Sequence, residues 1–283
     1  MADLSKEGVS VAALCHTLQV SRSGYYAWKQ GYRSSRAEEN RRLMPQVRAV
    51  FRDHKRRYGA RRIARELSAR GTSCGKQRVG RLMRQMGLEA IQPKSFRPRT
   101  TESRHRLGYS PNLLLNTPAP EEINRVWVGD ITYVPLVGNG FLYLALLMDL
   151  YSRRIVGWEL GPNMKEALVL SALRFAIAGR QPGSDLIHHT DRGGQYAGNE
   201  YRRVLARARM RQSMSRSDNC YDNAFMESCF GTVKRELEME RYDSEPIARK
   251  EISGYLRYYN TRRRHSALGY LAPEEFEYIK QAR

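Results

Sequence analysis

The sequence predicts an α/β domain, with a mixed five-stranded sheet and flanking helices, preceded by an all-α basic region. Two observations support this division. From residue 126 onward, short segments rich in Val, Ile, Leu and Tyr alternate with segments of helical periodicity, whereas the preceding region shows helical spacing alone. Charge divides at a similar point: residues 1–108 hold 25 Lys and Arg against 8 Asp and Glu, and residues 109–283 hold 24 against 21. A basic module attached to a nearly neutral domain indicates binding of a polyanion such as nucleic acid.

Residues 1–32 are predicted to form a short helix-turn-helix-like segment. Val11, Leu14 and Leu18 recur at helical spacing. Ser10 is a suitable N-cap for this helix because its hydroxyl can accept a hydrogen bond from a free backbone N–H. A turn then leads into a second short helix.

Residues 33–90 are predicted to form a basic helix-turn-helix-like domain. Apolar residues fall at helical spacing on both sides of Gly71, and Gly87 ends the pattern, since glycine readily adopts the left-handed backbone that terminates helices. Residues 76–86 are the candidate recognition helix. A basic helical bundle with solvated arginines is the alternative. The side chains expected to contact DNA are Arg61, Arg62, Arg65, Lys76, Arg78, Arg81 and Arg84.

Residues 91–122 are predicted to be a linker, because their first part lacks periodicity and combines prolines with basic residues. Residues 126–136, 141–150 and 154–160 are then expected to form three hairpin-connected strands.

The remainder of the domain at 123–283 alternates helices and strands and ends in a basic tail. Three antiparallel strands followed by helix, strand, helix, strand and helix is the element order of a ribonuclease-H-like fold. The expected elements are helices at 165–178, 199–208 and 224–240, strands at 186–190 and 210–215, and a polar loop at 217–223.

Three acidic residues fall where such a fold could bring them together. Asp130 lies in the middle of a strand, Asp191 follows the fourth strand directly, and Glu227 lies within a helix. A carboxylate in a buried strand is costly unless a metal or a partner compensates it. Oxygen ligands suit Mg²⁺ or Mn²⁺. Two such ions, about 3.5–4 Å apart, would activate the attacking oxygen and stabilise the leaving oxygen of a displacement at phosphorus.

Lys234 is the candidate DNA contact of this site. It follows Glu227 by seven residues, nearly two helical turns, so the two share a helix face about 10 Å apart, and Gly231 leaves the space between them open. A lysine there could hold a DNA phosphate beside the metal ligands. The alternative is a surface lysine paired with Glu238 at i+4.

Other polar residues near the carboxylates have simpler interpretations. The strand-end residues His188 and His189 are expected to pack or to orient neighbours, and Asp149 to cap a turn. Near the C-terminus, a run of three arginines forms a basic patch that either contacts DNA or is a solvated face. The patch consists of Arg262, Arg263 and Arg264.

Secretion and membrane insertion are not expected. Residues 1–10 carry no signal-peptide pattern, and the longest apolar run, at 141–148, is far shorter than the roughly 20 residues that span a bilayer. The cysteines show no CxxC pair, so free thiols in a reducing cytoplasm are expected. A cytoplasmic protein is therefore expected.

Four motifs carry a resemblance to a known family: WVGDITY, HHTDRGGQY, SRSDNCYDNAFMESCFGTVKRE and YYNTRRRHSALGYLAPEEF. Together with two N-terminal segments, they resemble the second-frame (OrfB-type) transposases of the third insertion-sequence family, relatives of retroviral integrases. The 35 residues between Asp191 and Glu227, with lysine seven residues later, match the DDE pattern of these enzymes. The zinc-binding module of retroviral integrases and a leucine-zipper segment are absent from the sequence.

The resemblance implies that Asp130, Asp191 and Glu227 are the catalytic metal ligands. It implies 3′-end cleavage by water and then attack of the freed 3′-hydroxyl on another phosphodiester, usually on the same strand first, which gives a circular intermediate. The implied partners are double-stranded DNA (terminal inverted repeats and target), further copies of the chain on that DNA, and the upstream-frame protein, free or fused. A structure-selective nuclease of the same fold and a non-catalytic DNA-binding regulator are the rival interpretations.

Overall fold

The computed structural model describes residues 10–31, 35–92, 108–138, 140–216, 224–239 and 241–282. The chain divides into two compact units, Met1–Ala90 and Ile91–Arg283. This division coincides with the predicted start of the linker. In the described part of the chain, no helix is both long and apolar enough to cross a bilayer.

The first two helices of unit 1 begin at serine caps. Helix α2 (Val11–Thr17) starts after Ser10, whose hydroxyl accepts from the Ala13 amide at 3.2 Å, and α3 (Arg22–Lys29) is capped in the same way by Ser21. These side chains satisfy backbone N–H groups that have no partner within the helix. The predicted helix, turn and helix are therefore confirmed.

Three further helices of unit 1 share one apolar core: α4 (Ser35–Asp53), α5 (Ala60–Ala69) and α6 (Lys76–Gln85). The positive φ values of Gly71 (85°) and Gly87 (64°) end α5 and α6, as expected from sequence. The basic helix-turn-helix arrangement is present. Its most buried apolar side chains are Val47, Val50, Tyr58, Ile63, Leu67 and Val79.

Unit 2 is built on the mixed five-stranded sheet that the sequence predicts. In the sheet order β3-β2-β1-β4-β5, the first three strands are antiparallel neighbours, and β4 and β5 run parallel to β1. The central strand β1 therefore has partners on both edges. The strands are β1 (Val126–Pro135), β2 (Phe141–Asp149), β3 (Ile155–Gly161), β4 (Ile187–Thr190) and β5 (Arg211–Met214).

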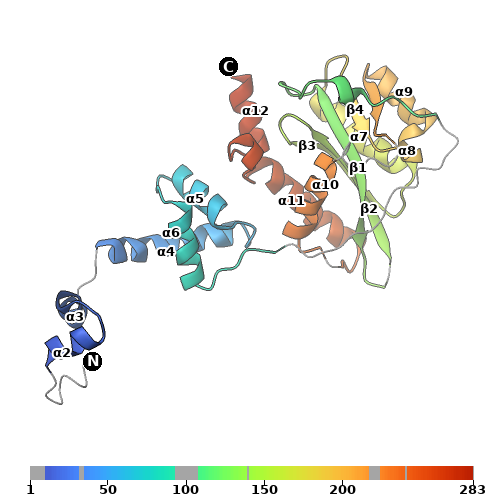
Figure 1. Ribbon diagram of the computed structural model, residues 1–283. Helices are drawn as coiled ribbons and strands as arrows, with labels where there is room; N and C mark the ends of the chain where they lie inside the picture. The colour runs from blue at the N-terminus through green and yellow to red at the C-terminus, as the bar shows by residue number, and fades with distance from the viewer. Residues whose placement is uncertain are drawn as a thin grey trace. The chain divides into compact units, whose positions relative to one another are not determined.

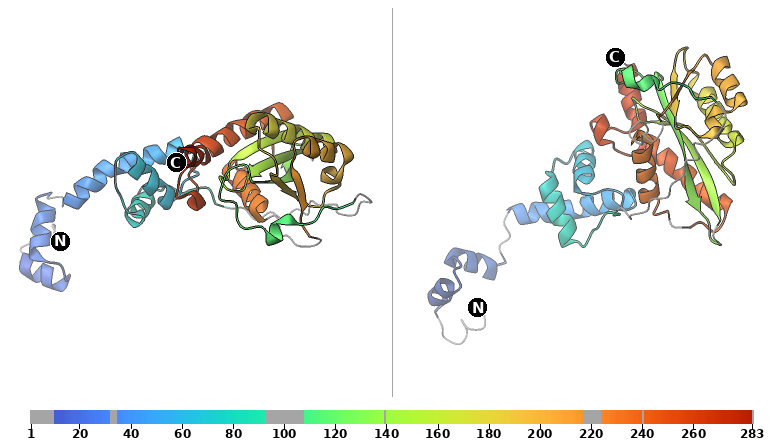
Figure 2. Two further views of the ribbon diagram at one scale, coloured as in Figure 1. Left: turned by 90° about the horizontal axis from the view of Figure 1, so that it is seen from above. Right: turned by 45° about the vertical axis from the view of Figure 1, so that its right-hand side comes forward.

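Helices cover both faces of this sheet, as Figures 1 and 2 show. One face packs against α7 (Glu166–Arg180), α8 (Gly194–Ala197) and α9 (Asn199–Arg207). The opposite face packs against α10 (Ala224–Glu236) and α11 (Glu245–Thr261). The short α8 and the long α11 have no counterpart in the sequence-based prediction. The predicted loop at 217–223 lies outside the described residues.

The C-terminal segment, expected as a basic tail, contains two further helical elements. After α11 come the short 3-10 helix η3 (Ser266–Leu268) and α12 (Pro273–Gln281). Glu277 of α12 is buried and accepts hydrogen bonds from Arg180 and Arg154 at 2.8–2.9 Å. These ion pairs attach α12 to the strand and helix layers.

Candidate active site

The strand register brings two of the three predicted carboxylates together. On one edge of β1, Asp130 lies opposite Leu146 of β2. On the other edge Val128 pairs with His189 of the parallel strand β4. Because the strands are parallel, the residue two positions after Val128 lies level with the residue two positions after His189. Asp191 is therefore level with Asp130. Neighbouring strands are about 4.8 Å apart, and level residues point to the same face of a sheet. The two carboxylates are therefore neighbours.

Electrostatics shows that the third carboxylate and the lysine belong to the same site. The pKa of Asp130 is raised well above its usual range, chiefly by burial and next by the charge of Asp191, with a smaller contribution from Glu227. The Ile131 amide, which donates to Asp130 Oδ1 at 2.7 Å, and the charge of Lys234 oppose this shift. The charges of Asp191, Glu227 and Lys234 thus all act on Asp130.

Helix α10 presents Glu227 and Lys234 beside the strands. Glu227 is exposed and Lys234 is half-buried. Between them, a Cβ atom added at Gly231 would meet no atom within 4 Å, so the space along this face is open. The opposite face of α10 holds the helix against the sheet through Met226, Cys229, Phe230 and Val233.

Lys234 faces the carboxylates and not Glu238. Helix α10 ends at Glu236, and Glu238 has a φ of 48°, so Glu238 does not lie one helical turn beyond Lys234. Burial lowers the pKa of Lys234, while the charge of Asp130 opposes that change. The structure favours the site-facing interpretation of this lysine over the i+4 surface pair.

The donor set fits a hard divalent cation. Asp130, Asp191 and Glu227 offer only oxygen, which Mg²⁺ and Mn²⁺ prefer, and a cation would relieve the repulsion that raises the pKa of Asp130. Among the described residues, no three His, Cys, Asp or Glu side chains are close enough to hold an ion by themselves. Mg²⁺ keeps several water or phosphate ligands when bound, so few protein oxygens are required.

The two histidines before Asp191 are packing groups, as expected. His188 hydrogen-bonds to the Tyr201 hydroxyl at 2.7 Å, and burial lowers its pKa to about 3, so it is neutral at physiological pH. His189 hydrogen-bonds to Ser213 of β5 at 2.8 Å. A Cβ atom at Gly129 would approach the His188 ring to 3.0 Å, so this glycine makes room for the ring.

Asp149 caps a turn, as predicted. Its Oδ1 accepts from the amides of Tyr151 and Ser152 at 3.0 and 2.9 Å, and its Oδ2 accepts from the Asn124 amide. These bonds hold the turn between β2 and β3.

Tyr196 is a neighbour of the carboxylates that the sequence-based prediction did not include. It is buried on α8, and its pKa is raised first by burial and then by the charges of Asp130 and Asp191. The available signal was its place five residues after Asp191, directly beyond the two glycines.

The C-terminal arginine patch requires a correction. Arg263 is only 3% exposed, and its guanidinium forms a buried ion pair with Glu236 of α10 at 2.8 Å. Its burial contradicts the predicted DNA contact. Arg264 is half-buried and donates to the Tyr270 carbonyl, which leaves Arg262 as the exposed member of the run.

In unit 1, the predicted basic residues divide by exposure. Arg78 is half-buried and bonded to Asn40 and Glu39, and Arg62 is half-buried against the Tyr58 ring. The fully exposed members are Arg61, Arg65, Lys76, Arg81 and Arg84.

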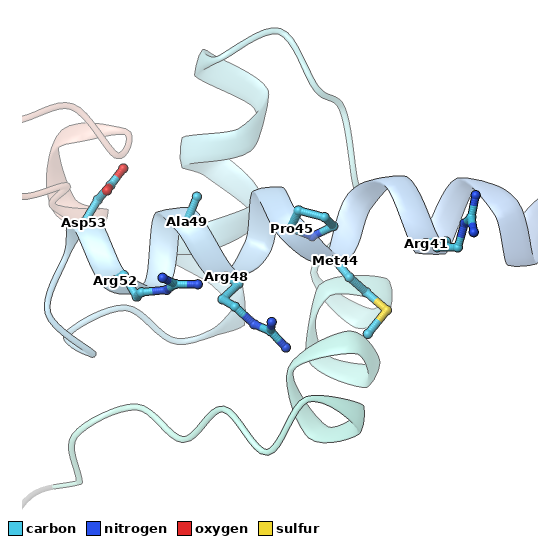
Figure 3. Close-up of a pocket in the computed structure, with 7 residues that line it drawn as sticks. All are labelled: Arg41, Met44, Pro45, Arg48, Ala49, Arg52 and Asp53. Atoms are coloured by element: carbon cyan, nitrogen blue, oxygen red, sulfur yellow. The ribbon is translucent and has the colours of Figure 1, made fainter.

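Helix α4 adds basic residues that the prediction omitted. Arg41, Arg48 and Arg52 line a surface hollow with Met44 and other residues of α4. Figure 3 shows these side chains along the helix, with Met44 and Arg48 directed to the same side. The sequence does indicate this arrangement, because Arg41, Arg48 and Arg52 follow the spacing i, i+7, i+11, which places residues on one helical face.

Comparison with known proteins gives matches over nearly the whole chain. Two family models described as integrase core domains match residues 120–220 and 208–273, and one described as an HTH-like domain matches residues 38–96. Transposase InsF for insertion sequence IS3A of Escherichia coli (strain K12) is 39% identical over 272 residues, 95% of this chain and 94% of that protein. The insertion element IS600 uncharacterized 31 kDa protein of Shigella sonnei is 41% identical over 265 residues, 93% of this chain and 97% of that protein.

Two solved structures are also similar. The HTLV-2 integrase catalytic core domain in complex with magnesium (dimeric form) has a TM-score of 0.44 and 16% identity, and covers 56% of this chain and 98% of its own. The simian T-cell lymphotropic virus intasome in complex with PP2A regulatory subunit B56 gamma has a TM-score of 0.49 and 15% identity, with 82% and 74% covered.

The buried ion pair gives a testable difference between adjacent arginines. We expect Arg263→Ala to lower the free energy of unfolding by about 3–5 kcal/mol, because it removes the counter-ion of the buried Glu236 carboxylate. Arg262→Ala, at the exposed neighbour, should change it by no more than about 0.5 kcal/mol. Urea denaturation followed by circular dichroism measures both, and equal midpoints would contradict the assignment.

Proposed function

Because this chain belongs to the transposases of the IS3 family of insertion sequences, which are DDE-type polynucleotidyl transferases, we propose that Asp130, Asp191 and Glu227 carry its DNA cutting and joining. The observation that supports this assignment most directly is that the strand register makes Asp191 level with Asp130, and that the charges of Asp191 and Glu227 both raise the pKa of Asp130. No structural requirement explains why a fold would gather like charges in this way. A site that binds cations and phosphates does explain it.

The three carboxylates would hold two divalent ions, either Mg²⁺ or Mn²⁺. When bound, such ions activate an attacking oxygen and stabilise the leaving oxygen at phosphorus. The chain's own contribution is to position these ligands. The Ile131 and Gly193 amides donate to Asp130 and Asp191 at 2.7 and 3.0 Å and fix one oxygen of each carboxylate.

The proposed reaction has two displacements at phosphorus. In the first, a water oxygen bonds to the phosphorus at the element end, and the bond to the 3′-oxygen breaks, so that a free 3′-hydroxyl is released. In the second, this 3′-hydroxyl oxygen bonds to another phosphodiester and expels its 3′-oxygen. Lys234 would hold a phosphate beside the reacting one, because its half-buried ammonium faces the open side of α10.

DNA binding is proposed to involve unit 1. The exposed arginines of α5 and α6, together with Arg41, Arg48 and Arg52 on α4, form a basic surface suited to phosphates. The proposed partners are the terminal inverted repeats, target DNA, further copies of this chain on that DNA, and the upstream-frame protein or a fusion with it. Location at the nucleoid in the bacterial cytoplasm follows from these partners.

The catalytic assignment is tested by isosteric neutralisation. Asp130→Asn, Asp191→Asn and Glu227→Gln should each abolish end cleavage and strand joining and leave DNA affinity nearly unchanged, because each removes a metal-binding charge without changing side-chain size. Labelled element ends, incubated with Mg²⁺ and target DNA, report both steps. A variant that keeps substantial joining activity removes its residue from the ligand set, and cleavage without joining in the unaltered protein would indicate a nuclease.

The role of Lys234 is tested with Glu238 as the matched control. Lys234→Ala should slow end cleavage by roughly 10- to 150-fold, the equivalent of one charge-assisted contact of about 1.5–3 kcal/mol. It should leave the unfolding midpoint unchanged. Glu238→Ala should change neither quantity, since α10 ends before this residue. Equal, negligible effects of both substitutions would make Lys234 an ordinary surface residue.

The basic surface of unit 1 is tested by salt dependence. The double variant Arg81→Ala/Arg84→Ala should bind duplex DNA more weakly, and the slope of log K against log salt should fall by about 0.9 for each lost phosphate contact. Arg70→Ala is the control, because Arg70 is already paired with Asp53 and Glu66. An unchanged slope in the double variant would locate the contacts elsewhere.

A further inference from the structure

Helices α2 and α3 (Figure 1) form a helix-turn-helix that the proposed function does not use. Helix α2 ends in a Schellman motif, in which the Val20 amide donates to the Cys15 carbonyl at 3.0 Å. The Gln19 amide donates to the His16 carbonyl at 3.2 Å, and Gln19 adopts the left-handed φ of 50° that this motif requires. Helix α3 then begins directly after the Ser21 cap. A turn of three or four residues between two short helices is typical of DNA-binding helix-turn-helix units.

The composition of this helix pair favours DNA as its partner. The helices contact each other, and their buried side chains are Cys15 of α2 and Tyr25 of α3. The HTH-like family model begins at residue 38, so it does not include them. Residues 10–31 contain Arg22 and Lys29 but no Asp or Glu. No carboxylate within this segment would therefore repel a phosphate backbone.

One face of α3 is exposed and carries Arg22, Tyr26 and Lys29. At about 100° per residue, these side chains point within about 60° of one another, and they span about 10 Å of the helix axis. This length corresponds to about three base pairs of duplex DNA.

The beginning of α3 carries the side chains suited to base contacts. A recognition helix contacts base edges with its N-terminal residues, and Arg22 and Ser23 are the first two residues of α3, both exposed. Arginine can donate two hydrogen bonds to guanine O6 and N7, and serine can bond to several bases. Lys29, at the other end of the same face, suits a phosphate contact.

We propose that α3 enters the major groove of duplex DNA, where Arg22 reads a base pair and Lys29 contacts a backbone phosphate. This goes beyond the proposed function, which assigns only phosphate contacts to unit 1, and it does not depend on the three carboxylates. The basic surface of α4, α5 and α6 then supplies affinity for any duplex, and α3 supplies base preference.

The test selects DNA with the full-length protein. A pool of duplexes with a randomised centre is bound in the presence of EDTA, which removes the divalent ions needed for cutting, and the bound duplexes are sequenced. The unaltered protein is compared with Arg22→Ala and with the double variant Arg81→Ala/Arg84→Ala. Arg207→Ala, which removes an exposed arginine of α9, is the matched control.

We expect the unaltered protein and Arg207→Ala to select the same sequence motif. Arg22→Ala should lose the preference at one base pair and bind the selected duplex about 5- to 150-fold more weakly, with a much smaller change for unrelated duplexes. Lys29→Ala and Arg81→Ala/Arg84→Ala should keep the motif and bind every duplex more weakly, because phosphate contacts carry no base preference.

The turn provides a second pair of variants that leaves the DNA-facing side chains in place. Gln19→Gly suits the positive φ and should keep the motif. Gln19→Val places a β-branched residue in a conformation that it rarely adopts, so it should displace α3 and lose the motif. The main unfolding midpoint should stay the same in both, because neither helix contributes to the apolar core of α4, α5 and α6 or to those of unit 2.

Three results would overturn the proposal: no motif for the unaltered protein, an unchanged motif for Arg22→Ala, or an unchanged motif for Gln19→Val. The exposed Trp28 tests docking of a protein instead. A changed oligomeric state of Trp28→Ala in light scattering, together with an unchanged motif for Arg22→Ala, would assign the segment to protein contacts.

Cleavage of labelled element ends with Mg²⁺ is measured separately. If the unaltered protein does not cleave, the proposed function is contradicted while the selected motif stands by itself. Normal cleavage by the unaltered protein, together with an unchanged motif for Arg22→Ala, would contradict only the role of α3.

Discussion

The repulsion between Asp130 and Asp191 is the constraint on which the rest of unit 2 depends. Both carboxylates lie where adjacent parallel strands meet, and burial together with their proximity raises the pKa of Asp130. A fold tolerates such a pair only if packing elsewhere compensates for it. The two apolar layers that enclose the sheet supply that compensation. A bound cation would replace the repulsion between the two carboxylates by attraction of both to the cation.

The neutral groups around the pair serve the same constraint. His188 is kept uncharged by burial and hydrogen-bonds to Tyr201, while Gly129 makes room for its ring beside β1. The site therefore receives its positive charge from the periphery, and not from the strands. Lys234 of α10 provides it.

The C-terminal segment explains how α10 keeps its orientation. Glu236 ends this helix and pairs with Arg263 inside the protein, so the segment after α11 is tied to the element that carries Glu227. A buried pair of this kind is weak evidence for net stability, but breaking it is costly. The face of α10 that carries Glu227 and Lys234 can therefore stay open, because the pair of Glu236 and Arg263 anchors the end of the helix.

Local pattern in the sequence determined the strands, the main helices, the serine caps and the three candidate carboxylates, because periodicity, capping and spacing are properties of neighbouring residues. The tertiary structure alone decided which arginines are exposed to solvent and which are buried in ion pairs. Within the run 262–264 the side chains are chemically identical, yet Arg263 is buried because its partner is Glu236, 27 residues earlier. Likewise Arg154 pairs with Glu277, 123 residues away. Burial and pairing depend on contacts between distant segments, and those contacts exist only once the sheet and its helices have packed.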